Sequence, residues 1–438
     1  MLVDSATLQD LGILPSPAVR GTTLWSLVNR TRTRVGSDAL RERVLAPSHD
    51  ADEILSRQRA HHVLAADADV YRQALHRASP DAVERYLNAT WQLPRDMPPL
   101  IRVRQWYRQY VRDVERGRTL VAALLASADD LRERMARTDA LLLRELGDEI
   151  GTLMDAPPMY ALRDALSSRT SVSALLRFDQ LARERAKPSL QRLLQCLGTL
   201  EALWSMGVAT VEHGWTYPRP SSRLRASGLF HPFLGRDAVA NDLHIDDRVR
   251  VCFVTGPNMA GKSTFLKATA LAVFLAHLGC GVPASSMEFR PVGTVFSSVQ
   301  IVDDLMVGES FYLAEVRRIG ALAAALADHG SALAVVDEPF RGTNVHDSVE
   351  ATLAVITRLA EHSAVLVLVA SHLGEVVPSI LHDGRIAFWS FAADVTGDEP
   401  RFDYRLREGV SQQRLGMTLL RQEGILERLE CVARREKA

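Results

Sequence analysis

The stretch from Arg248 to Thr264 reads RVRVCFVTGPNMAGKST, and it decides the fold of the second half of the chain. Residues 248–255 are rich in β-branched and aromatic side chains, which predicts a buried strand. A glycine-rich segment follows, and residues 265–278 continue with apolar residues at helical spacing. A strand, a tight glycine loop and a helix in this order form the pattern of a phosphate-binding loop.

The glycines of this loop let successive backbone N–H groups turn inward around an anion, and the following helix N-terminus adds about half a positive charge. In this pattern Lys262 reaches the β- and γ-phosphates of a nucleotide, and the Ser263 hydroxyl ligates Mg²⁺. A chance glycine-rich turn is the alternative, which the flanking strand and helix disfavour. The candidate nucleotide-binding residues are Gly256, Pro257, Asn258, Met259, Ala260, Gly261, Lys262, Ser263 and Thr264.

Two acids follow a second apolar run, residues 332–336. The run predicts a buried parallel strand that ends at Asp337 and Glu338. Hydrolysis of a nucleotide needs a carboxylate on the metal side of the phosphates and a group that activates water. Asp337 is therefore the second candidate metal ligand, and Glu338 the candidate catalytic base. Two solvated acids at a strand end are the alternative.

A third apolar run, residues 364–370, ends at Ser371 and His372. The carboxyl ends of neighbouring strands converge on one crevice in open α/β sheets, so we expect His372 near the γ-phosphate. There it would donate a hydrogen bond to the phosphate or to the attacking water. The candidate catalytic residues are Glu338, His372 and Lys262; a purely structural histidine is the alternative.

The motifs at 256–264, 337–344 (DEPFRGTN) and 370–372 (ASH) together resemble the ATPase core of the MutS family of DNA mismatch-repair proteins. Further short matches lie at 230–232 (FHP), at 303–315 and at 404–416. The resemblance spans residues 226–425, and the Pro-Asn-Met version of the loop is its most specific part. In the first half, 24–27 (LWSL) and 29–47 resemble the start of the MutS core domain, which carries lever helices.

This resemblance implies an ATPase that uses ATP and Mg²⁺ at sites in a dimer interface, because MutS proteins are relatives of the ABC and SMC ATPases. Ser310 would approach the γ-phosphate bound by the other subunit, and Asn258 and the loop 341–344 would lie at the same seam. A homodimer promoted by ATP is therefore expected. The residue after Ser310 is Phe311, where many family members have threonine, and Ala260 replaces a common glycine.

The fold expected from these features is an α/β P-loop NTPase domain of the ABC and MutS type, preceded by an all-α core and lever domain. We place the two domains at 1–225 and 226–438, with 217–222 (YPRPSS) as the linker. Within the first, Gly147 and Gly151 are expected to end a long helix. The helical run from 160 to 206 is expected to break at Pro188, with Gly198 as a second candidate break.

Composition bounds the setting of the protein. Its four cysteines form neither a metal pattern nor a disulfide framework, and no apolar run reaches the length of a membrane span. We expect a cytoplasmic, nucleoid-associated protein without a membrane partner. Residues 1–225 carry 32 Lys and Arg against 27 Asp and Glu, a net of +5, and the remainder carries 20 against 26, a net of −6. The positive net charge of residues 1–225 suits contact with DNA.

The sharpest basic segment runs from Arg102 to Arg118, where Arg104, Arg108 and Arg112 recur every four residues and share one helix face. With the interleaved aromatic residues, they are candidates for contact with DNA phosphates and bases. An ordinary solvated helix face with its aromatic residues in the core is the alternative.

Three functions fit the sequence. The first is a DNA-dependent ATPase that binds duplex or branched DNA without sequence specificity and without reading mismatches. This expectation rests on the lack of a Phe-x-Glu motif and on a chain that begins at the core domain. The second is a nucleotide-switched module that binds a protein partner. The third is a mismatch-repair component that relies on a partner for lesion recognition.

Overall fold

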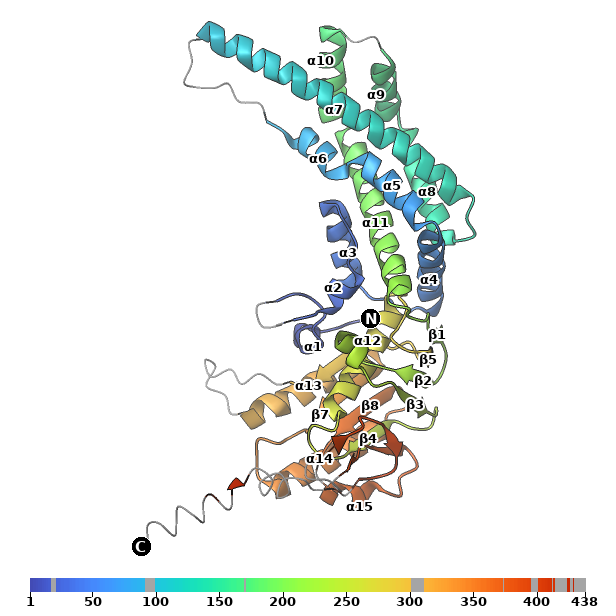
Figure 1. Ribbon diagram of the computed structural model, residues 1–438, viewed down its shortest axis with the longest axis vertical. Coiled ribbons are helices and arrows are strands. Elements are labelled where there is room, and N and C mark those ends of the chain that lie inside the picture. The colour runs from blue at the N-terminus through green and yellow to red at the C-terminus, as the bar shows by residue number, and fades with distance from the viewer. Residues whose placement is uncertain are drawn as a thin grey trace.

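The computed structural model describes residues 1–16, 21–90, 99–168, 171–300, 311–372, 374–394, 401–411, 413, 424–425 and 428. These residues form a crescent with a helical arm above and a mixed α/β part below (Figure 1). Within these ranges, no helix combines the length and the apolar character that crossing a membrane requires.

The arm consists of helices, and several of them start at a capping residue: the side chains of Thr23, Thr33 and Asp50 accept first-turn N–H groups. The helices of the first half of the chain are α1 (Ser5–Asp10), which lies against the lower part, and α2 (Leu24–Val28), α3 (Arg34–Leu45), α4 (Ala51–Ala66), α5 (Ala68–Ala78), α6 (Pro80–Asn88), α7 (Pro99–Ala136), α8 (Leu141–Met154), α9 (Pro157–Ser167), α10 (Val172–Gln180), the π-helix η1 (Leu181–Arg185) and α11 (Lys187–Glu212). Helix α11 runs along the arm and packs on α3, α4 and α8.

Glycines inside α11 allow neighbouring backbones to come close. A Cβ on Gly198 would lie 2.6 Å from the carbonyl oxygen of Val35, and a Cβ on Gly207 would lie 2.6 Å from that of His61. Gly147 and Gly151 likewise lie inside α8, against Met135 and Arg132 of α7. The expectation that these two glycines end a helix is therefore wrong, because their small size serves helix packing.

The lower part is built on a six-stranded sheet in the order β12-β9-β4-β8-β7-β6. All neighbours are parallel except β12, which pairs antiparallel with β9. The strands are β4 (Val251–Thr255), β6 (Thr294–Ser298), β7 (Ala332–Asp337), β8 (Val365–Ala370), β9 (Ile386–Ser390) and β12 (Arg407–Glu408). The helices and turns of this part are α12 (Lys262–His277), α13 (Phe311–His329), α14 (Val345–Ala360), η3 (Gly374–Val376) and α15 (Val377–Ile380).

Alternate side chains of the strands enter two different apolar layers. Cys252 and Val254 of β4 pack with α12 in one layer, and Val251 and Phe253 pack with residues of α13 and α14 in the other. The sheet is therefore buried on both faces, as is typical of parallel sheets.

A small second sheet joins the lower part to the arm. Its strands, in the order β1-β5-β2-β3, are β1 (Arg219–Pro220), β5 (Ser286–Phe289), β2 (Leu224–Leu229) and β3 (Asn241–Ile245); nearby lie η2 (Pro232–Asp237) and the pair β10 (Ala393–Asp394) and β11 (Arg401–Phe402). Part of the segment expected to be a linker is thus strand β1, paired in parallel with β5. One apolar cluster also contains Leu24, Ile54 and Met206 of the arm together with Leu271 and Phe274 of α12.

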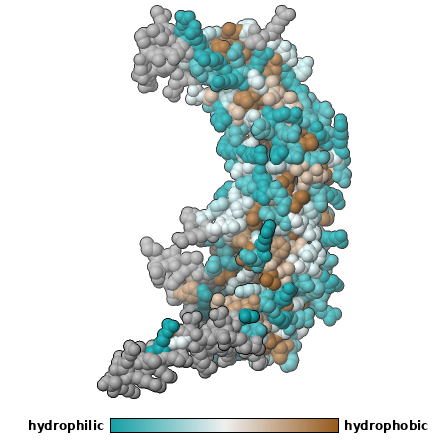
Figure 2. All heavy atoms as spheres, in the orientation of Figure 1, coloured by the Kyte–Doolittle hydropathy of each residue, from teal (hydrophilic) through white to brown (hydrophobic). Residues whose placement is uncertain are grey.

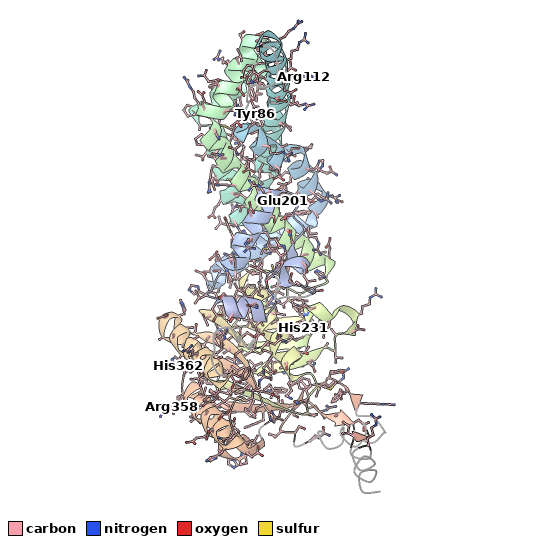
Figure 3. The ribbon with its side chains drawn as sticks, turned by 90° about the vertical axis from the view of Figure 1, so that its left-hand side faces the viewer. Tyr86, Arg112, Glu201, His231, Arg358 and His362 are labelled. Carbon is pink, nitrogen blue, oxygen red and sulfur yellow. The ribbon has the colours of Figure 1, made fainter. Side chains whose placement is uncertain are left out.

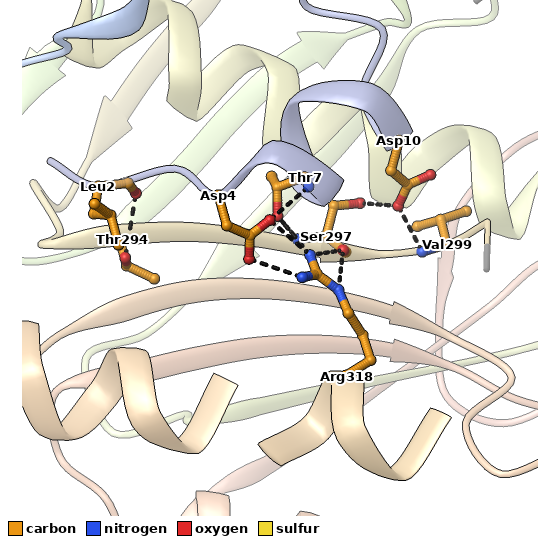
Figure 4. A network of polar contacts seen from close by, with 8 residues as sticks. All are labelled: Leu2, Asp4, Thr7, Asp10, Thr294, Ser297, Val299 and Arg318. Atoms are coloured by element: carbon orange, nitrogen blue, oxygen red, sulfur yellow. Dashed lines mark hydrogen bonds and ion pairs between the residues drawn. The ribbon is translucent and has the colours of Figure 1, made fainter. Parts of the chain in front are cut away.

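The N-terminal segment binds to the edge of the large sheet through polar contacts (Figure 4). Leu2 bridges to Thr294 of β6, and the Asp4 carboxylate accepts from the Arg318 guanidinium of α13 at 2.8 Å. Asp10 accepts from the Val299 N–H at 2.7 Å and pairs with Lys267 of α12 at 3.1 Å. These contacts hold the first helix against three elements of the α/β part.

We predict that Gly207→Ala destabilises the protein, because the new methyl group would meet the backbone of His61 inside a packed helix contact. Overpacking of this kind lowers the free energy of unfolding by about 1–3 kcal/mol. Gly320→Ala in α13 is the matched control: a Cβ there meets no atom within 4 Å, so helix propensity favours alanine. Urea denaturation of the three chains measures the difference, and equal stability of both variants would contradict the packing argument.

Candidate nucleotide site

Three parallel strands bring the predicted residues to one edge of the sheet. Strand β8 lies between β4 and β7, so the segments that follow the three strands are neighbours. The Glu338 N–H donates to the Ala370 carbonyl at 2.8 Å, and the Ser371 N–H donates to the Val254 carbonyl at 3.1 Å. These bonds fix the ends of the strands relative to one another.

The glycine loop turns between β4 and α12 in a conformation that its sequence permits. Gly256 has φ 139° and Gly261 has φ 106°, and a Cβ on Gly256 would lie 2.6 Å from the Phe391 carbonyl oxygen. Only glycine meets both requirements at position 256. Met259 also has a positive φ, of 67°, and its side chain is 75% exposed, whereas Ala260 is buried.

Helix α12 starts at Lys262 directly after the loop, and no side chain of the described residues caps its first turn. The first-turn N–H groups of a helix have no partner within the helix, and they carry the positive end of its dipole. Ser263 and Thr264 in this turn are exposed. The beginning of this 16-residue helix therefore offers donors to an anion at the loop.

Lys262 is 5% exposed, and its ammonium group lies on the loop itself. Its Nζ donates to the carbonyls of Gly256 at 2.9 Å and Pro257 at 3.2 Å, and to Asn258 Oδ1 at 3.4 Å. Burial lowers the pKa of Lys262 below its usual value, and the nearby charges of Glu338 and Asp337 oppose that shift. The ammonium of Lys262 thus donates to the loop carbonyls and also lies near the charges of Asp337 and Glu338.

Ser263 and Asp337 lie in contact, as a shared metal site requires. The Ser263 hydroxyl donates to Oδ2 of Asp337, and the other oxygen, Oδ1, is buried without a hydrogen-bond partner among the described residues. Burial is the main cause that raises the pKa of Asp337, and the hydrogen bond from Ser263 opposes it. A buried, unsatisfied carboxylate oxygen beside a hydroxyl fits Mg²⁺, which prefers oxygen ligands.

Glu338 and His372 form an ion pair across the strand ends, with 3.2 Å between Oε1 and Nδ1. The hydrogen bond from His372 lowers the pKa of Glu338, and the same bond raises the pKa of His372. Glu338 has a positive φ of 47°, which is uncommon for a residue with a side chain and is found mostly at functional turns. The backbone thus holds this carboxylate in a strained position beside His372.

The loop after Glu338 is tied to α13. The Glu315 carboxylate, which is 3% exposed, accepts from the N–H groups of Arg341 at 3.3 Å and Gly342 at 3.1 Å. The Arg341 guanidinium lies 4.9 Å from the ring centre of Phe311. Asn344 caps α14 through a bond from the Asp347 N–H at 3.0 Å.

Ser310 belongs to 301–310, outside the described residues. Its predicted approach to a second subunit stays a prediction.

Several residues that support the site were not predicted from the sequence. Phe391 lies against Gly256, and the Thr255 hydroxyl accepts from the Ser411 N–H at 2.8 Å. A Cβ on Gly261 would contact the ring of Tyr404 at 3.4 Å. These contacts come from segments more than a hundred residues away. Tyr404 and Ser411 lie in the 404–416 match to the family, but that match did not predict their contacts with the loop.

The three candidate DNA-binding arginines of α7 are far from this site. Arg104, Arg108 and Arg112 are exposed, and Figure 3 places Arg112 near the upper end of the arm. Of the interleaved aromatic residues, Tyr110 donates its hydroxyl to Asp179 at 2.8 Å, while Tyr107 is 40% exposed. The aromatic residues are therefore divided between the core and the surface.

Within the described ranges, no group of three or more His, Cys, Asp and Glu side chains is arranged to hold a metal ion. Ser263 and Asp337 are the residues that would hold Mg²⁺ at the strand ends.

Comparison with known proteins assigns the chain to a family. Residues 252–436 match MutS domain V, the ATPase domain of the family, and residues 6–207 match MutS domain III. The chain is 31% identical over 246 residues to the DNA mismatch repair protein MutS 2 of Halobacterium salinarum, covering 55% of this chain and 28% of the relative. It is 31% identical over 264 residues to the MutS protein of Syntrophomonas wolfei, covering 56% and 30%.

A longer alignment of 516 positions with the MutS protein of Thermosipho melanesiensis has 23% identity and covers 97% of this chain and 62% of the relative. The chain therefore belongs to the MutS family, the DNA mismatch-repair family whose ATPase domain it carries. It spans about three tenths of the length of the first two relatives.

The Glu338–His372 pair predicts a pH-dependent contribution to stability. A raised histidine pKa stabilises the fold below the ordinary value of 6.5 and loses that effect as the pH rises through the raised value. A lowered glutamate pKa stabilises above the ordinary value of 4.5. The melting-temperature loss in His372→Ala should be largest between these two values and should vanish at alkaline pH. His346→Ala, an exposed histidine on α14, is the control, and a loss independent of pH would contradict the pair.

Proposed function

We propose that this protein is an ATPase that hydrolyses ATP to ADP and phosphate and couples the reaction to DNA binding. The observation that carries the proposal is the convergence of Lys262, Asp337, Glu338 and His372 at one sheet edge, beside an uncapped helix N-terminus. A phosphate loop alone would support nucleotide binding only. The adjacent acids supply the groups that hydrolysis needs.

The loop 256–264 would bind the phosphates through its N–H groups. Lys262 would leave the loop carbonyls for the β- and γ-phosphates, which offer its buried charge a stronger partner. Ser263 and Asp337 would hold Mg²⁺, and the ion would neutralise charge that develops on the phosphate oxygens.

Glu338 would orient the attacking water and take its proton. His372 would hold the carboxylate in place before the reaction and donate a hydrogen bond to the phosphate or to the water during it. The His372 side chain is 56% exposed, so it is free to turn from Glu338 to a ligand.

We further propose that two copies of the chain close on ATP, with Ser310 of each reaching the nucleotide of the other. Met259 and Arg341 are exposed, and they belong to the two loops, 256–264 and 341–344, that would meet in such a pair. We retain 226–438 as the ATPase domain and 1–225 as the helical domain that transmits its state. The continuous apolar cluster between α12 and the arm is the physical basis for that transmission.

The DNA would be duplex or branched, bound through its phosphates and without sequence specificity. A preference for such DNA over mismatches is a prediction from the sequence. A nucleotide-switched protein-interaction module and a mismatch-repair component that depends on a partner are the competing functions, and DNA titrations separate them.

We predict that Glu338→Gln keeps ATP binding and lowers hydrolysis about 100-fold or more, because a general base contributes about 10²–10⁴ to the rate. The ATP-bound dimer should then accumulate and elute earlier in size-exclusion chromatography. Lys262→Ala should instead weaken ATP binding about tenfold or more, as expected for loss of a charged hydrogen bond. Glu350→Gln, the same change at an exposed position of α14, is the control. Parental turnover in Glu338→Gln would exclude Glu338 as the base.

We predict that matched or branched duplex DNA raises ATP turnover and that DNA affinity falls steeply with salt, because phosphate contacts release counterions. The measurement is steady-state ATPase activity and fluorescence anisotropy with matched, G·T-mismatched and branched DNA at two salt concentrations. ATP turnover that DNA does not change, together with no DNA binding at low salt, would favour the protein-interaction module. A clear preference for the G·T duplex would favour the mismatch-repair component.

A further inference from the structure

A basic cavity lies in the arm where α3, α5, α6 and α11 meet. It has a volume of about 240 Å³, and its lining includes Arg32, Arg72 and Arg85 together with Asp81 and Glu201. A second cavity of about 460 Å³ shares Arg32, Arg72 and His76 with the first and adds Arg77. Leu75 and Trp204 form an apolar part of the lining. We call this pair of cavities the arm cavity.

The two acids in the arm cavity are already satisfied by donors of the protein. Glu201, which is 4% exposed, accepts from the N–H groups of Arg32 at 2.7 Å and Thr33 at 3.3 Å, and also from the Thr33 hydroxyl. Both oxygens of Asp81 accept from the Arg34 N–H at 3.0 Å. Both carboxylates thus accept from N–H groups at or just before the start of α3, and not from the arginine guanidinium groups of the cavity.

The arginines of the arm cavity fall into two groups. Arg72 and Arg77 pair with acids outside its lining, Asp69 at 2.5 Å and Asp130 at 3.0 Å. Arg32 and Arg85 are exposed, and in the described part of the chain neither guanidinium has a recorded hydrogen bond or ion pair. Two unpaired guanidinium groups therefore face one concavity, and two further cations stand beside them.

The N-terminus of helix α6 also borders the arm cavity. Helix α6 begins at Pro80, and residues 79–82 are part of the lining. Ser79 makes no side-chain capping bond there and adopts a left-handed conformation with φ 44°. Asp81 lies in the first turn of α6 and its charge offsets the helix dipole, so the guanidinium groups of Arg32 and Arg85 are what favours an anion with several oxygens here.

The position of the arm cavity indicates the kind of anion. Figure 3 faces the concave side of the crescent and places Glu201 in the middle of the arm, with Arg112 above it. Hydrophilic side chains cover the arm above α3 in Figure 2. Arginine forks match phosphate oxygens in a bidentate manner, and a row of such contacts along a concave face suits a phosphate backbone.

We propose that the arm cavity is a DNA-phosphate site in which Arg32 and Arg85 bind the backbone of a duplex. The proposal rests on the DNA binding proposed above and names the surface that carries it. Arg72 and Arg77 lie beside these two arginines, each paired with an acid outside the lining. The contact is with phosphates, so it carries no base specificity.

The test compares DNA binding by the parent and by Arg32→Ala/Arg85→Ala in the full chain. We expect the double variant to bind a labelled matched duplex about tenfold more weakly at low salt, with the slope of log K against log salt reduced by about 1–2. Arg32→Lys/Arg85→Lys should recover much of the affinity, because a lysine still supplies a point charge to a phosphate. Basal ATPase activity without DNA should be unchanged.

Arg59→Ala/Arg144→Ala is the matched control, since it removes two exposed arginines from α4 and α8 and gives the same net charge. If the parent binds DNA and the two alanine variants bind it equally well, the arm cavity is not the site, and the proposed function is unaffected. If the parent itself fails to bind duplex at low salt, both the arm site and the proposed DNA binding are wrong.

A small free anion is the other source of the same chemistry, and inorganic pyrophosphate tests it. The measurement uses chains that carry Lys262→Ala, so that the phosphate loop contributes little. Our proposal predicts that arginine removal changes duplex affinity. A pyrophosphate-induced rise in melting temperature that depends on Arg32 and Arg85, with duplex affinity unchanged by their removal, would overturn it.

Discussion

A parallel sheet buried on both faces leaves only its strand ends for polar chemistry, and the candidate site follows from this constraint. Strands β4, β7 and β8 place apolar side chains in both layers, so their inner residues carry no charge, and charged side chains stand only at the last strand residue, Asp337, or beyond the strands. Because all three run in the same direction, their first polar residues emerge at the same edge. Lys262, Asp337 and His372 are neighbours for that reason, although they are far apart along the chain.

The same helix that begins at the glycine loop also anchors the arm. Helix α12 begins at Lys262, and its apolar residues share one cluster with side chains of α2, α4 and α11. At its end, the carbonyl of Gly279 accepts from the buried His61 ring at 2.8 Å. Close backbone contacts at Gly198 and Gly207 join α11 to the segments beside it. A change at the loop therefore has a continuous packed route to the arm.

Much of the site could be predicted from the sequence because each apolar run stops at a polar or charged residue, which marks the end of the strand. The run 332–336 stops at two acids, and the run 364–370 stops at a serine and a histidine. Glycines in the arm were less informative: Gly147 and Gly151 resemble helix breaks in sequence but pack against α7 in the fold. A missing side chain signals either flexibility or close packing, and local sequence does not separate the two. Tertiary contacts decide between them.

The sequence by itself determined the mixed α/β class, the family, and the residues whose chemistry suits a nucleotide, because these depend on local pattern and residue type. Only the tertiary structure decided that Lys262 lies on its own loop, that Asp337 keeps one buried oxygen unsatisfied, and that Glu338 pairs with His372. It alone brought Arg32 and Arg85 to one cavity. Glu338 and His372, like Arg32 and Arg85, lie tens of positions apart in the sequence. Their geometry is set by how the layers pack, and no period in the sequence encodes that packing.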